Sequence, residues 1–195
     1  GGFVGVGEPT ACAQNGRFFQ LADVLGVDEE KGLSLNTDKY NIKAEAGHFI
    51  FEDMPAPDFG EDKKNIYALK GTQVLEIAFS DRFTRSVNVG EVKAAVNEYG
   101  KGRSFYITGL PYSFANARLL YRALLWTAHK EEYAKKIFST NVAVDCHFYA
   151  ADDAYALVNN TFEEQTTVFY DVTGDAQEVT LSPMQIIWLE SDAKK

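Results

Sequence analysis

The chain has 195 residues, 46% of them hydrophobic and 13% aromatic, and carries 19 basic against 28 acidic side chains for a net charge of −9. A chain of this size and hydrophobicity can bury a core without disulfide or metal staples, which argues against disorder. The acidic balance argues against nucleic acid and anionic membranes as partners. No apolar run is long enough for a transmembrane helix and no secretory segment opens the sequence, so the expected compartment is the cytoplasm.

Residues 2–7 predict a buried strand at the start of the chain. Because residue 1 is glycine rather than methionine, we expect the 195 residues not to be the whole protein. The run continues as GVGEPT (residues 5–10), a glycine-rich exit from a strand where the backbone can approach a ligand closely. Thr10 stands where a dinucleotide fingerprint needs its third glycine, so phosphate cradling has weak support. Ligands gather beyond the carboxyl ends of strands, so Glu8 and Thr10 are candidate ligand contacts, with a tight turn as the alternative.

Two amphipathic helices are predicted in the first part of the chain. The first covers residues 18–25, because its apolar residues recur with helical spacing, and Gly26 stands where a C-terminal helix glycine belongs. The second begins after Ser113, a preferred N-cap residue. Its predicted apolar face is formed by Leu120, Ala123, Leu124 and Thr127.

Two strands and a long polar connection complete the first part. Residues 92–96 and 104–108 predict strands joined by a glycine-containing hairpin. Residues 36–64 are polar, acidic and rich in proline and glycine, with one apolar stretch at 49–51. They predict an ordered connection with few regular elements, which is often functional. A strand that leads through a loop into a long helix is typical of an α/β domain.

Charge divides the chain near Lys136. Residues 1–135 hold 16 basic and 18 acidic side chains, whereas residues 136–195 hold 3 and 10. The last part alternates apolar and polar residues between turn signals, which predicts a small antiparallel sandwich or open barrel. An α/β domain over 1–135 and an all-β domain over 136–195 are therefore expected. The predicted strands of the second domain are residues 142–149, 155–158, 166–170, 177–181 and 185–189.

The remaining candidate groups indicate little chemistry. Cys146 and His147 are neighbours on a predicted strand and point to opposite faces, so they cannot form a thiolate–imidazole pair. His48 lies in an acidic stretch (residues 45–53) whose spacing matches no compact zinc pattern, so neither a metal nor a cofactor is predicted. Residues 159–161 match a glycosylation sequon, for which a turn is the preferred interpretation. Core packing is preferred to an aromatic sugar platform for Tyr149, Phe162, Phe169 and Trp188.

Blocks along the chain resemble successive segments of the galacto-N-biose/lacto-N-biose phosphorylase family. Characteristic examples are GFVGVGEPTA (residues 2–11), VNEYGKGR (96–103) and GLPYS (109–113). The blocks occur in order over most of the chain, which makes the resemblance more specific than any single motif. The other blocks are residues 16–28, 35–40, 64–68, 118–120, 158–160 and 183–186.

The resemblance implies a cytoplasmic enzyme that cleaves a β-galactosyl linkage with inorganic phosphate, giving galactose 1-phosphate and an acceptor sugar. It implies a catalytic (β/α) barrel, which contains the general-acid aspartate, then a flavodoxin-like domain and a small β domain. This chain would hold the latter part of the flavodoxin-like domain, which is also similar to glutamine amidotransferases, and the β domain. No catalytic residue, cofactor or metal is then expected here. The candidates for edging the substrate pocket are Glu8, Pro9, Thr10 and Arg17.

A second hypothesis is a non-catalytic module for subunit association or carbohydrate binding. The α/β part resembles the trimerisation domains of some β-galactosidases, which supports a homo-oligomer. The expected partners are a sugar substrate and inorganic phosphate in the full-length enzyme, or further copies of the chain. Neither hypothesis includes nucleic acid or a membrane.

Overall fold

The computed structural model describes residues 1–11, 19–30, 43–52, 54–79 and 90–191. Within it the chain forms two compact units, Gly1–His129 and Lys130–Lys195, each with its own core. None of the described helices has the length and apolarity needed to cross a membrane.

The first unit is built on a four-stranded mixed sheet in the order β1-β6-β5-β4. β1 and β6 pair in parallel, whereas β6 with β5 and β5 with β4 pair antiparallel. The flavodoxin-like fold is therefore not confirmed, because β1 and β6 are the only parallel pair among the described strands. The strands are β1 (Gly2–Val6), β4 (Gln73–Phe79), β5 (Gly90–Tyr99) and β6 (Gly102–Ile107).

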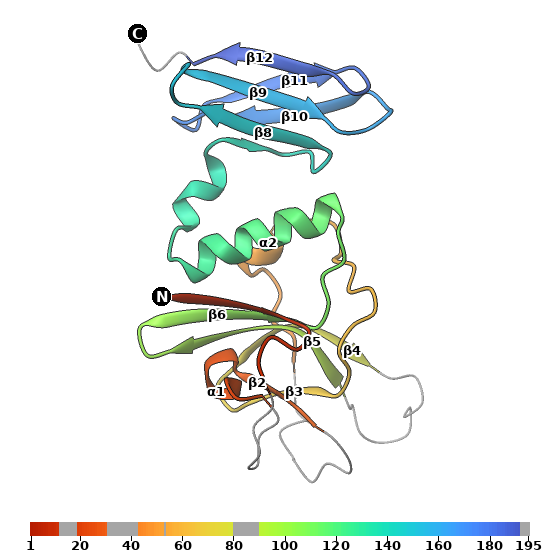
Figure 1. The fold of residues 1–195 in the computed structure, drawn as a ribbon, viewed down its shortest axis with the longest axis vertical. Helices are drawn as coiled ribbons and strands as arrows, with labels where there is room; N and C mark the ends of the chain where they lie inside the picture. Colours follow the sequence, from red (N-terminus) through yellow and green to blue (C-terminus); the bar gives the residue numbers. More distant parts are fainter. Residues whose placement is uncertain (12–18, 31–42, 53, 80–89, 192–195) are drawn as a thin grey trace. The chain divides into compact units, whose positions relative to one another are not determined.

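Both faces of this sheet are covered (Figure 1). On one face α2 packs with a short 3-10 helix, η2, over Phe105 and Ile107 of β6. On the other face α1 and an antiparallel strand pair, β2 with β3, cover Tyr106. Successive residues of β6 thus serve opposite cores, as the pleat of a strand requires. These elements are α1 (Ala22–Leu25), β2 (Val27–Glu29), η2 (Phe49–Phe51), β3 (Ile66–Ala68) and α2 (Phe114–Thr127).

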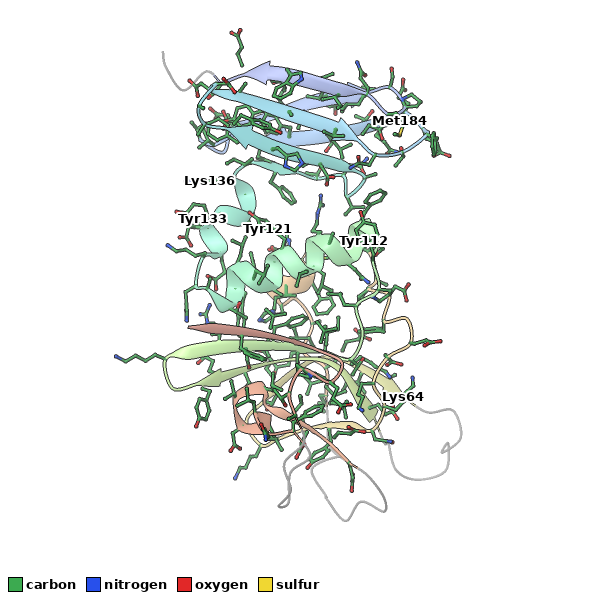
Figure 2. All side chains as sticks on the ribbon, in the orientation of Figure 1. Lys64, Tyr112, Tyr121, Tyr133, Lys136 and Met184 are labelled. Carbon is green, nitrogen blue, oxygen red and sulfur yellow. The ribbon has the colours of Figure 1, made fainter. Side chains whose placement is uncertain are left out.

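Gly26 as the C-terminal end of α1 and Ser113 as the N-cap of α2 are confirmed, but α1 begins at Ala22 and not at residue 18. Of the predicted buried face of α2, only Ala123 and Thr127 are buried. Gly26 ends α1 with a φ of 74°, and the Ser113 hydroxyl caps α2 by accepting a hydrogen bond from the Asn116 N–H at 3.1 Å. Leu124 is 51% exposed on the outer side of α2, where Figure 2 also shows Tyr121. The residues that α2 buries are Asn116, Leu119, Arg122, Ala123, Trp126 and Thr127.

β1 differs from the buried strand that its sequence predicts. It is the outermost described strand of its sheet and buries only Gly5. The predicted strands at 92–96 and 104–108 are confirmed as parts of β5 and β6, and Gly100 has the positive φ of their turn. β2, β3 and β4 were not predicted. Within the predicted irregular connection, the described part holds η2 as its one helix.

The second unit is a small antiparallel sandwich. One sheet has the order β11-β10-β7 and the other β12-β9-β8 (Figure 1). Between them Tyr155, Leu157 and Phe169 are at most 3% exposed. All five predicted strands are confirmed, and β7 is an addition. The elements are η4 (Glu131–Lys135), β7 (Phe138–Ser139), β8 (Val144–Tyr149), β9 (Ala154–Asn159), β10 (Gln165–Tyr170), β11 (Ala176–Leu181) and β12 (Ile186–Glu190).

Core packing is correct for only one of the four aromatic residues to which it was assigned. Phe169 is 3% exposed, but Tyr149, Trp188 and Phe162 are 45%, 60% and 87% exposed. Tyr149 and Trp188 follow or precede residues that face the core, so the alternation of each strand turns their rings outward. Alternation predicts two faces, and it does not by itself say which one is buried.

Candidate functional site

The carboxyl ends of β1 and β6 meet at one edge of their sheet, with Val6 in register with Ile107. Gly7 follows β1 with a φ of 62°, a conformation that glycine adopts without steric cost. Its N–H donates to the carbonyl oxygen of Ile107 at 2.9 Å, and its own carbonyl accepts from the Tyr106 hydroxyl at 2.7 Å. Burial raises the pKa of Tyr106, so the hydroxyl stays a donor. The turn that carries Glu8 is thereby fixed to both strands.

Glu8 belongs to an ion-pair group that joins three segments of the chain. Lys63 Nζ lies 2.7 Å from Glu8 Oε2 and 3.1 Å from Glu29 Oε2, and the Lys63 N–H donates to the Thr108 carbonyl at 2.8 Å. The hydrogen bond to Glu8 raises the pKa of Lys63, so the ammonium group stays charged. The Glu29 side chain is 6% exposed and that of Glu8 is 46% exposed. Glu8 is therefore the carboxylate of this group that a ligand can reach.

A more deeply buried ion-pair group is centred on Asp62. Lys93 Nζ lies 2.5 Å from Asp62 Oδ2, and the two side chains are 8% and 6% exposed. Thr108 Oγ1 donates to the same oxygen at 3.2 Å, while Lys64, labelled in Figure 2, pairs with the other one. Burial raises the pKa of Asp62, but the hydrogen bonds from Lys64 and Lys93 outweigh it and hold the pKa below its ordinary value. Asp62 is therefore an ionised structural acceptor.

The depressed pKa of Asp62 predicts an acid-labile contribution to stability. A carboxyl whose pKa is lower in the native state stabilises the fold fully above its unfolded pKa of about 3.9, and the contribution is lost as the pH falls through the native pKa. Urea unfolding between pH 6 and pH 2 is expected to show a steeper loss of stability in the natural chain than in Asp62→Asn. Parallel curves for the two proteins would contradict this assignment.

The structure brings three of the four predicted pocket residues together behind β1. Beside Glu8, Pro9 packs against the strand, since a Cβ at Gly5 would lie 3.0 Å from Pro9 Cγ. The Thr10 hydroxyl oxygen is buried and has no hydrogen-bond partner among the described residues. Arg17 lies outside the described residues. Contact of any of the four with a ligand stays a prediction.

The sequence patterns did not predict the charged residues that organise this edge: Lys63, which pairs with Glu8 and Glu29, and the pair Asp62 and Lys93. A signal existed for Lys93, the one charged residue within the apolar run 92–96, because a charge on a buried strand requires a partner. No comparable signal marks Glu29 or Asp62. Their positions depend on contacts between segments distant in sequence.

The described residues contain no group of three or more His, Cys, Asp or Glu side chains placed to hold a metal ion. His48 has a structural role, because its Nδ1 accepts from the Ile50 N–H at 3.2 Å and caps η2. Burial raises the pKa of the Cys146 thiol to about 12, which leaves it a poor nucleophile. The β1–β6 edge offers the carboxylates of Glu8, Glu29 and Asp62 and the ammonium groups that pair with them, which suit hydrogen bonding to a polar ligand.

Comparison with known families identifies both units. The lacto-N-biose phosphorylase central domain matches residues 1–132, and the lacto-N-biose phosphorylase C-terminal domain matches residues 137–189. The chain belongs to the lacto-N-biose phosphorylase family. The resemblance seen in the sequence blocks is confirmed.

Curated relatives of this lacto-N-biose phosphorylase family member are considerably longer. A 1,3-beta-galactosyl-N-acetylhexosamine phosphorylase of Lachnoclostridium phytofermentans is 47% identical over 191 residues, which are 97% of this chain and 25% of the relative. One of Bifidobacterium longum is 35% identical over 224 residues, covering 98% of this chain and 29% of the relative. The chain therefore spans about a quarter of the length of these relatives.

The family member also shares its fold with a solved β-galactosidase. The crystal structure of a cold-adapted β-galactosidase from Rahnella sp. R3 superposes with a TM-score of 0.56 and 19% sequence identity. The superposition covers 97% of this chain and 28% of the β-galactosidase. At this identity the similarity shows a common fold.

Proposed function

We propose that this chain is part of an inverting glycoside phosphorylase that cleaves β-galactosides of the galacto-N-biose/lacto-N-biose type with inorganic phosphate. The products are galactose 1-phosphate and an acceptor sugar, and the compartment is the cytoplasm. The observation that carries the proposal is the match of both units to domains of the lacto-N-biose phosphorylase family. The 47%-identical relative, named as a phosphorylase of 1,3-β-galactosyl-N-acetylhexosamine, supports the substrate class.

In this proposal the general acid belongs to a part of the enzyme outside these residues. Phosphorolysis needs a protonated acid at the leaving glycosidic oxygen and a phosphate held on the opposite face of the galactose ring. An acid of this kind normally has a raised pKa, whereas the pKa of Asp62 is lowered. Glu8, Pro9, Thr10 and Arg17 are proposed to edge the sugar pocket. Glu8 would accept a hydrogen bond from a sugar hydroxyl while Lys63 holds its carboxylate in place.

An activity assay tests where the general acid lies. The 195-residue chain, incubated with galactosyl-β1,3-N-acetylglucosamine and phosphate, is expected to release no galactose 1-phosphate detectable by ³¹P NMR. A chimera in which this chain replaces the matching quarter of the 47%-identical relative is expected to release it. Turnover by the 195-residue chain would contradict the location of the acid, and a folded, inactive chimera would contradict the family function.

The alternative function is a scaffold for a homo-oligomer. The outer side of α2 favours it, because Tyr121 and Leu124 are 43% and 51% exposed there and Tyr112, just before the helix, is 88% exposed (Figure 2). Apolar side chains gathered on one side of a helix are typical of an interaction surface. Sedimentation velocity measures the outcome directly, and a chain that stays monomeric at high micromolar concentration would remove this alternative.

A further inference from the structure

Two exposed aromatic rings meet on the outer face of the sheet β12-β9-β8. Tyr149 of β8 and Trp188 of β12 have ring centroids 5.2 Å apart and planes inclined by 48°, although β9 lies between their strands. β9 presents Ala154 and Ala156 at this level, with Ala156 in register with Trp188 and Ala154 with Tyr149. Because these side chains are small, the rings reach across β9. Ala156 is only 3% exposed, while Tyr149 and Trp188 are 45% and 60% exposed.

Polar groups surround this aromatic pair. The strand registers place His147 of β8 opposite Ala156 and Glu190 of β12 opposite Ala154, on the same face as the rings. His147 and Glu190 are both exposed. Among the described residues no hydrogen-bond partner is found for the Tyr149 hydroxyl, the Trp188 indole N–H or the Glu190 carboxylate. The face therefore combines a preformed apolar surface with donors and acceptors that are available to a ligand.

We infer that this face, formed by Tyr149, Trp188, His147 and Glu190, binds the ring of a neutral sugar. A pyranose such as galactose has one face of C–H groups, which packs on an aromatic ring, and a rim of hydroxyl groups that hydrogen-bond in the ring plane. Tyr149 and Trp188 supply the apolar surface. The Glu190 carboxylate accepts from sugar hydroxyls, and the indole N–H donates to a sugar oxygen.

Charge favours a neutral sugar over the other occupants. No lysine or arginine stands between Lys136 and Lys194, so the strands β7 to β12 carry none of the cations that a phosphorylated or nucleic-acid ligand requires. A second copy docked face to face would bury Glu190 and the exposed Asp145 of both chains within one interface. Like charges in a desolvated interface are unfavourable. A neutral ligand rich in hydroxyl groups needs no cation on the protein and brings no further negative charge to this face.

The two tryptophans of the chain make the binding measurable residue by residue. Trp188 is 60% exposed, whereas Trp126 is 8% exposed in the first unit. Titration of the ¹⁵N-labelled chain with methyl β-galactoside, N-acetylglucosamine or soluble β-galactan, without phosphate, is expected to shift the Trp188 indole signal and leave that of Trp126 in place. The absence of phosphate and of turnover separates this result from the proposed phosphorolysis. No shift of the Trp188 signal with any of the three probes would overturn the inference.

Matched variants identify the rings as the binding surface. Trp188→Ala and Tyr149→Ala are expected to weaken sugar binding at least about tenfold, because each removes one stacking face. Phe162→Ala is the control, since this ring is 87% exposed in the turn between β9 and β10 and lies outside the aromatic pair. Its binding is expected to stay within about twofold of that of the natural chain. Equal losses in all three variants, or burial of Trp188 in a dimer without sugar binding, would overturn the inference.

Discussion

Asp62→Ala is expected to lower the free energy of unfolding of the first unit by about 3–5 kcal/mol, the usual effect of removing one partner of a buried ion pair. The Lys93 side chain is 8% exposed, and Glu91, at 3.2 Å, is the one ion-pair partner that it keeps among the described residues once Asp62 is gone. Thr108 Oγ1 also loses its acceptor. Urea unfolding followed by Trp126 fluorescence in a Trp188→Phe background reports on this unit alone, because Trp126 is its only tryptophan.

Glu61→Gln is the matched control for Asp62→Ala. Glu61 is the preceding residue, carries the same charge and is exposed, and no hydrogen bond or ion pair is found for it among the described residues. Its substitution is expected to change stability by less than about 0.5 kcal/mol. If the two variants lost the same stability, Asp62 would act through the general charge of the unit and not through Lys93.

The second unit was the more predictable part of the fold. Its strands carry period-two alternation and are separated by turn residues, and four of them pair with the next strand in sequence, β8 with β9 and β10 with β11. Local pattern and final structure therefore agree. The alternation left open which face is buried, so Tyr149 and Trp188 were assigned to the core although they lie outside it.

The first unit depends on contacts that the local sequence does not reveal. α2 buries Arg122, because its Nη1 donates to the Phe49 carbonyl at 3.0 Å and its guanidinium lies 5.3 Å from the centre of the Phe49 ring. Residue 49 belongs to η2, far away in sequence, so helical spacing alone favoured Leu124 for the buried side. A charged side chain can be buried in place of an apolar one when a residue distant in sequence supplies its hydrogen bond.

The candidate site also has one part that the local sequence predicts and another part that depends on contacts between distant segments. The glycine-rich exit of β1 could be predicted, since Gly7 has a positive φ and the turn carries Glu8 to the carboxyl edge of two strands. The ion-pair partner of Glu8 could not, because Lys63, which also pairs with Glu29, belongs to a segment that is placed by the β2–β3 pair and by the hydrogen bond from Lys63 to Thr108. A sequence motif can therefore locate the turn that carries Glu8, whereas the residue that pairs with Glu8 is known only from the tertiary fold.

Asn159→Ala is expected to destabilise the second unit by about 2–4 kcal/mol, because it removes several side-chain hydrogen bonds that each contribute about 0.5–1.5 kcal/mol. The Asn159 side chain is buried at the end of β9, where its Nδ2 donates to the carbonyls of Glu163 and Ser182 at 2.7 and 2.9 Å. Its Oδ1 accepts from the Thr161 N–H at 2.9 Å and from the Thr161 hydroxyl at 2.8 Å. The segment that matches a glycosylation sequon is therefore a turn built around a buried amide.

Asn160→Ala is the control for Asn159→Ala, because it removes the neighbouring asparagine of the same turn without removing the hydrogen bonds of the buried Asn159 amide. Asn160 is exposed, and its side chain makes one hydrogen bond, to Asp145, at 2.5 Å. Its loss is expected to cost less than about 1 kcal/mol. Hydrogen exchange of the amides in β9, β10 and β11 measures both variants, since Asn159 links the end of β9 to the chain before β10 and after β11. Similar exchange in the two variants would show that the turn, and not the buried amide, holds the sandwich together at this end.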